Sequence, residues 1–220
     1  MGVQSGMNEQ RGTQEQQSFG SWVKWLFQTF FFRILGINLV FLISCVPIIT
    51  IPAALCGLQS VFQQYYRKQY ATVALSAFFS EFFSSFVKRT LTIWGIVLIP
   101  IAVVIAAGRF LPYALWFSFA CIMLVAVILV LSWLVPQLVL LNLDIRQALK
   151  NALLLTGIES ITNLGLVAVH AVSMTVLVFG LPASAMLLVI LPVLNAILIT
   201  GLTMPVLRKY LVIPEENRER

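Results

Sequence analysis

The stretch LSAFFSEFFSSFVKR, Leu75–Arg89, decides how the chain is arranged, because it looks like part of a membrane span and yet contains a carboxylate. On a helical wheel its five phenylalanines share one face, and Glu81, Lys88 and the serines occupy the other. A glutamate in the middle of a span costs about 2.5–3.5 kcal/mol. We therefore predict an amphipathic helix over about residues 74–89 that lies on the membrane surface.

The composition of the whole chain requires a membrane environment. Of the 220 residues, 60% are hydrophobic and only 10% are charged, and the mean hydropathy is +0.97. A soluble domain carries about a quarter charged residues, so this chain could not cover a water-facing surface. Apolar runs of about 20 residues are typical of transmembrane helices. The predicted fold class is an all-α, polytopic membrane helical bundle.

Six apolar runs, bounded by glycine, proline or charge, are candidate spans and pair into three hairpins. The runs are residues 32–49, 52–66, 91–107, 113–141, 163–179 and 183–207. The second run is shorter than the about 20 residues that a crossing requires. Two alternatives follow for it: a complete crossing, or a re-entrant hairpin with the first run.

The positive charges support this threading. Of the 14 lysines and arginines, all but Arg109 fall on the side that also holds both termini, and so do all eight acids. An excess of lysine and arginine marks the cytoplasmic side. We therefore expect a multi-pass protein with both termini in the cytoplasm.

The remaining segments define the domain organisation. Residues 1–18 form a polar tail that we expect to be disordered, residues 19–212 form a single transmembrane domain, and residues 213–220 form a charged tail. A second amphipathic helix is predicted over about residues 144–160. Docking of the two amphipathic helices on the bundle explains their apolar faces. The alternative is a surface for a cytoplasmic partner, made by Glu81, Lys88, Arg89, Arg146 and Lys150.

Polar residues inside predicted spans are the candidates for a functional site. They are Asn38, Gln59, His170 and Asn195, and His170 is the only histidine. Together they predict a possible polar cluster that binds a solute or relays protons. The simpler alternative is hydrogen bonding between helices, which contributes about 0.6 kcal/mol on average.

Several activities lack the residues they need. No acid falls in a predicted span, which disfavours transport coupled to cations or protons. There is no nucleotide-binding glycine loop and no HExxH or GxSxG motif. The three cysteines lack metal-ligand spacing. We therefore expect no enzyme, no cofactor and no metal, and no nucleic-acid partner.

Three stretches resemble the YesL-like family of bacterial membrane proteins. They are NLVFLISCVPIITIPAALCGLQSVFQQYYRKQ (Asn38–Gln69), AFFSEFFSSFVK and IRQALKNALLL (Ile145–Leu155). The positions that carry the resemblance are Asn38, Pro47, Thr50, Ile51, Pro52, Ala53, Arg67, Phe78, Phe82, Phe86 and Ala148–Ala152. It covers about residues 30–160, and the glycine that the family often has between the turn isoleucine and proline is missing at Ile51-Pro52.

The resemblance implies a six-span-like protein of the bacterial inner membrane, commonly encoded near genes for carbohydrate uptake and degradation. It implies no biochemical activity. We expect an accessory or regulatory component of a carbohydrate uptake system, with the lipid bilayer and components of a carbohydrate ABC transport system as partners. The alternative is a small transporter or channel for a neutral solute such as a sugar. A third reading, an ABC-permease-like half, has only the segment ALKNALLLTGIES in its favour.

Overall fold

The computed structural model describes residues 19–67, 74–180 and 185–210, and every regular element in these ranges is helical. The predicted all-α fold class is confirmed. The predicted tails, 1–18 and 213–220, lie outside the described residues. The elements are α2 (Phe19–Ser44), the 3-10 turn η1 (Ile48–Thr50), α3 (Ile51–Tyr66), α4 (Ala74–Lys88), α5 (Thr90–Ala107), α6 (Tyr113–Leu141), α7 (Ile145–Ile158), α8 (Ser160–Gly180) and α9 (Ala185–Tyr210).

Local sequence explains where several helices begin and end. Pro52 stands in the first turn of α3, where its missing N–H costs no hydrogen bond. The turn before it is closed by the Thr50 hydroxyl, which reaches the carbonyls of Ser44 and Pro47. At the end of α6, Asn142 adopts a left-handed conformation with φ 46°, a common way to end a helix.

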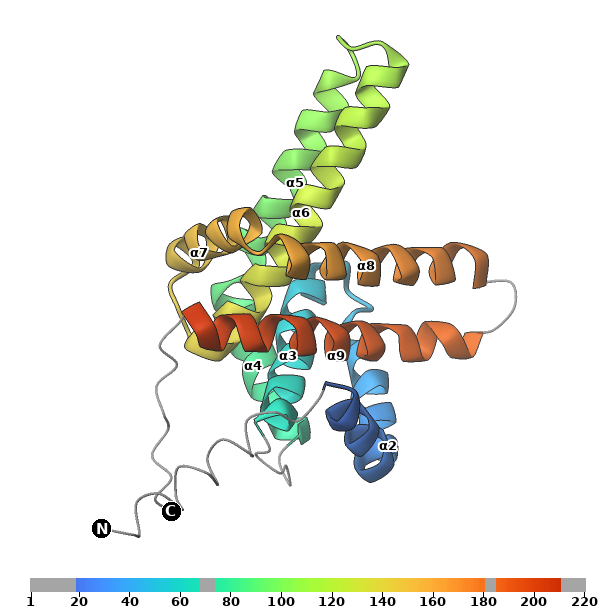
Figure 1. Ribbon diagram of the computed structural model, residues 1–220, viewed down its shortest axis with the longest axis vertical. Coiled ribbons are helices and arrows are strands. Elements are labelled where there is room, and N and C mark those ends of the chain that lie inside the picture. Colours follow the sequence, from blue (N-terminus) through green and yellow to red (C-terminus); the bar gives the residue numbers. More distant parts are fainter. Residues whose placement is uncertain (1–18, 68–73, 181–184, 211–220) are drawn as a thin grey trace.

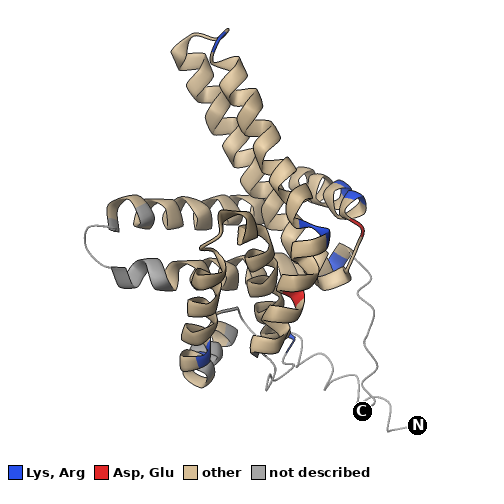
Figure 2. Cartoon of the chain, turned by 180° about the vertical axis from the view of Figure 1, so that it is seen from behind, with Lys and Arg blue, Asp and Glu red and all other residues tan. Residues whose placement is uncertain are grey.

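Two hairpins, α5–α6 and α8–α9, leave a common region in different directions, while α2, α3 and α4 pack at their base (Figure 1). The helices of both hairpins are almost free of charge (Figure 2). Arg109 lies in the turn between α5 and α6, and the other charged residues of the described ranges lie near the base, on α2 or in the last turn of α9. This composition fits hairpins whose helices contact lipid. Which side is cytoplasmic stays a prediction.

The residues that the structure describes contain fewer helices fit to cross a membrane than the six predicted spans. Within the described residues, three helices are long and apolar enough to span a bilayer: α5, α6 and the part of α9 from Ile190. A fourth span results if α7 and α8, which meet at a 100° bend, are counted as one broken span. The apolar part of α2, Phe31–Ser44, is shorter than these. By length and composition, the described chain supports three or four crossings where the sequence predicts six.

Helix α3 accounts for part of this difference. It corresponds to the predicted second span, but 12 of its 16 residues are buried, and it contacts α2, α4, α6 and α9. It is an inner helix that holds the others together. Hydropathy cannot distinguish such a helix from one that faces lipid, because both are apolar.

Helix α4 forms where the sequence predicts it, but its apolar face divides in two. Phe78 is completely buried and approaches α3 so closely that a Cβ atom at Gly57 would lie 2.9 Å from the Phe78 carbonyl oxygen. The rings of Phe78 and Phe82 stack at 6.0 Å along this inner row. Phe79 and Phe83 form a second, exposed row. The inner row docks the helix, and the outer row remains available to lipid.

Candidate functional site

A cavity of about 410 Å³ lies between α2, α3, α6, α8 and α9. Its volume is in the range of ligand pockets, about 300–1,000 Å³. Most of its lining is aliphatic or aromatic, and none of the residues that line it is charged. The cavity can therefore receive a mainly apolar, uncharged molecule.

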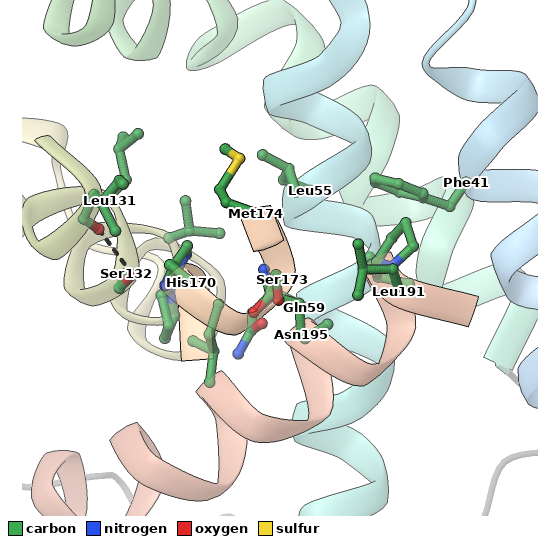
Figure 3. Close-up of a pocket in the computed structure, with 17 residues that line it drawn as sticks. Phe41, Leu55, Gln59, Leu131, Ser132, His170, Ser173, Met174, Leu191 and Asn195 are labelled. Atoms are coloured by element: carbon green, nitrogen blue, oxygen red, sulfur yellow. Dashed lines mark hydrogen bonds between the residues drawn. The ribbon is translucent and has the colours of Figure 1, made fainter. Parts of the chain in front are cut away.

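Three of the four predicted polar residues meet in this cavity, although they are far apart in sequence. Gln59 comes from α3, His170 from α8 and Asn195 from α9 (Figure 3). The fourth, Asn38, is buried elsewhere in the packing of α2 and does not line the cavity, and neither of its side-chain polar atoms has a partner in the described part of the chain. The structure thus assembles a polar cluster without Asn38.

Two serines belong to the same cavity and were missed in the sequence. Ser132 lies on α6, and Ser173 lies on α8 one turn after His170. The spacing of three residues between His170 and Ser173, which places both on one helix face, could have indicated the second serine. Ser132 gave no signal, because a serine in a long apolar run is ordinarily satisfied within its own helix.

The donors of the two serines and of His170 already bind carbonyl oxygens of their own helices. Ser132 and Ser173 each donate a hydrogen bond to the carbonyl four residues earlier, at 2.8 Å. The Nδ1 atom of His170 lies 2.8 Å from the Leu166 carbonyl oxygen, which can only accept, so Nδ1 carries the proton. In the neutral ring Nε2 is then an acceptor, and both serine oxygens keep lone pairs free.

The amides complete this pattern. Gln59 donates to the Thr200 hydroxyl at 2.8 Å, and Thr200 donates in turn to a carbonyl of its own helix, which fixes α3 against α9. The Oδ1 atom of Asn195 is buried and has no partner among the described residues. The polar residues of the cavity therefore offer acceptors, and the amide nitrogens of Gln59 and Asn195 add N–H donors.

The predicted partner surface is only partly a surface. Arg89 and Glu81 form an ion pair at 2.6 Å, and their side chains are only 7% and 21% exposed. Arg89 also donates to the Asn142 Oδ1 atom at 2.6 Å. A charge buried at the junction of α4 and α5 needs such partners. These two residues therefore join α4 to the end of α6 and are not free to bind a partner, contrary to the prediction.

The other three members of the predicted surface, Lys88, Arg146 and Lys150, are exposed. The Arg89–Asn142 hydrogen bond brings the end of α4 close to the segment that leads into α7, so these cations lie in one region of the molecule.

In the described ranges, no group of three or more His, Cys, Asp or Glu is arranged to hold a metal ion.

The apolar helices and the uncharged cavity define a membrane-embedded α-helical protein. A family model with the description "Protein of unknown function, DUF624" matches residues 34–107. The matched region includes Asn38 and Gln59 and ends with α5, before the three helices that supply the rest of the polar cluster. No curated protein and no solved structure matches the chain. The YesL-like name and the carbohydrate setting stay predictions.

Proposed function

We propose that this protein binds a small neutral solute within its helical domain and carries it across the membrane as a transporter or channel. One observation carries the proposal: Gln59, His170 and Asn195, from three different helices, line one cavity that has no charged side chain. Polar side chains that serve only to hold helices together have no reason to line the same cavity.

The absence of charge in the lining determines the kind of solute. An ionised ligand would lose its hydration in this cavity and find no opposite charge there, at a large cost in free energy. Proton or cation coupling usually relies on buried carboxylates. None lines the cavity, so the solute moves down its own gradient.

Flux into liposomes tests this function. The purified full-length chain is reconstituted, and uptake of glycerol, glucose and a disaccharide is followed with His170→Ala, Asn195→Leu and Asn38→Leu beside the wild type. Asn38→Leu is the matched control, because Asn38 is a buried amide outside the cavity. We expect flux of at least one solute, lost in the two cavity variants and kept in the control. Equal flux in liposomes without protein for every solute would refute the function.

A second candidate function is an accessory or regulatory role in a bacterial carbohydrate uptake system in the inner membrane. It is supported by the exposed cations Lys88, Arg146 and Lys150, which lie on the two segments that the Arg89–Asn142 hydrogen bond brings together. Co-purification of components of an ABC transport system with the tagged protein tests it. The role predicts that changing all three cations to glutamine releases the partner, and retention of the partner would contradict it.

A further inference from the structure

We infer that Thr200 is a positioning residue for the solute: it holds the Gln59 amide in one orientation at the cavity, and it thereby sets how tightly the solute binds. The inference rests on the proposed function, since it concerns the same cavity. It is carried by a chain of hydrogen bonds that links the Ala196 carbonyl, the Thr200 hydroxyl and Gln59. Thr200 does not line the cavity itself and is completely buried in α9.

The direction of this chain of hydrogen bonds follows from the groups in it. The Thr200 hydroxyl lies 2.7 Å from the Ala196 carbonyl oxygen, which can only accept, so the hydroxyl hydrogen points there. Toward Gln59, which is 2.8 Å away, the hydroxyl oxygen can then only accept. The Nε2 end of the Gln59 amide is therefore the end that faces Thr200.

This arrangement leaves the rest of the Gln59 amide for a solute. Gln59 lines the cavity and donates one of its two N–H groups to Thr200. The Oε1 atom and the second N–H can bind a solute that donates or accepts a hydrogen bond. A glutamine side chain that is free to turn loses this freedom each time a solute binds, at a cost in entropy. A side chain that is already held in place avoids the cost, so Thr200 raises the affinity through Gln59.

Two other buried residues make comparable hydrogen bonds that do not involve Gln59. Thr203, also in α9, donates to a carbonyl of its own helix at 2.7 Å, as Thr200 does. Gln63, one turn after Gln59 in α3, donates to the Pro136 carbonyl of α6 at 2.9 Å. Neither Thr203 nor Gln63 lines the cavity. Changes at these two positions therefore separate an effect on the solute from a general weakening of the helix packing.

The dependence of liposome flux on the concentration of glycerol, glucose and the disaccharide tests the inference. Thr200→Val keeps the shape of the side chain and removes its hydroxyl, and Thr200→Ser keeps the hydroxyl. The controls are Thr203→Val and Gln63→Met. If Thr200→Val does not fold, Thr200→Ala beside Thr200→Ser makes the same comparison with smaller side chains. The unfolding midpoint of each full-length variant is measured in parallel.

We expect Thr200→Val to raise the solute concentration at half-maximal flux by about three- to tenfold, the effect of one hydrogen bond, and to leave the maximal flux nearly unchanged. Thr200→Ser should keep the wild-type value. Thr203→Val and Gln63→Met should also keep it, even where they lower the unfolding midpoint.

An unchanged half-saturation concentration in Thr200→Val would overturn the inference and leave the proposed function intact. An equal rise in Thr203→Val, Gln63→Met or Thr200→Ser would overturn it too, because the effect would then come from helix packing and not from the hydroxyl. If no solute crosses wild-type liposomes faster than liposomes without protein, the inference and the proposed function are both removed.

Discussion

The ion pair between Glu81 and Arg89 allows a stability prediction whose size follows from the structure. Glu81→Gln keeps the shape of the side chain and removes its charge, which leaves the buried Arg89 guanidinium with only neutral partners, Asn142 and Ser85, among the described residues. Breaking a fully buried pair costs about 3–5 kcal/mol. Glu81 retains some access to its surroundings, so we expect a loss of about 2–3 kcal/mol in the free energy of unfolding.

Titration of the protein in mixed micelles with a denaturing detergent, followed by tryptophan fluorescence, measures this loss. The double variant Glu81→Leu/Arg89→Met should be less destabilised than Glu81→Gln, because it leaves no charge behind. Lys209→Gln is the control: Lys209 lies 3.7 Å from Glu159 but is 67% exposed, so its pair contributes at most about 1 kcal/mol. If Glu81→Gln and Lys209→Gln lower the free energy of unfolding equally, the buried Glu81–Arg89 ion pair does not stabilise the fold in the way described.

Three further predictions follow from packing and buried polar groups. Gly57→Ala should destabilise the protein by about 1–3 kcal/mol in the same unfolding titration, because the new methyl group would press on Phe78; an unchanged midpoint would contradict the close approach of α3 and α4. Asn38→Leu should raise the free energy of unfolding by about 1–2 kcal/mol, since it replaces an amide that is buried without a partner among the described residues by an apolar side chain of similar shape. A loss of stability would show that the amide is satisfied. Trp133→Phe should lower the free energy of unfolding by about 1–2 kcal/mol, because Asn163 Oδ1 loses its 2.8 Å hydrogen bond. Circular dichroism gives the unfolding midpoint of this variant, and an unchanged midpoint would count against that bond.

Residues that typically end helices made much of the helix pattern predictable from the sequence. The run 113–141 coincides with α6, and the run 91–107 differs from α5 by one residue, because glycine, proline and charge mark the ends of both. The phenylalanine segment was likewise correctly recognised as a separate helix, α4. These features depend on residues within a few positions of one another, which is why the sequence alone reveals them.

Features that depend on distant parts of the chain were not predictable in the same way. The sequence presents α3 as a short span, and only the packing of other helices around it makes it an inner helix. The sequence analysis assigns Arg89 to a partner surface, but the structure brings it an acceptor, the Asn142 Oδ1 atom, from 53 residues away. Of the predicted polar residues, Gln59, His170 and Asn195 line one cavity and Asn38 lies outside it, a difference that the sequence does not reveal because no periodicity relates different helices.

The histidine offers the most direct test of the cavity as a ligand site. Because His170 is the only histidine in the chain, selective ¹⁵N labelling gives one imidazole and no ambiguity of assignment. The His170 Nδ1 atom lies 2.8 Å from the Leu166 carbonyl oxygen, so in the neutral ring Nε2 is the acceptor, and the residue lines the cavity. Titration of the nanodisc-embedded protein with the solutes of the flux panel should shift the Nε2 resonance in a saturable way for at least one of them, equally in wild type and in Asn38→Leu. An Nε2 resonance that stays unchanged with every one of these molecules would contradict the claim that this cavity binds a neutral solute.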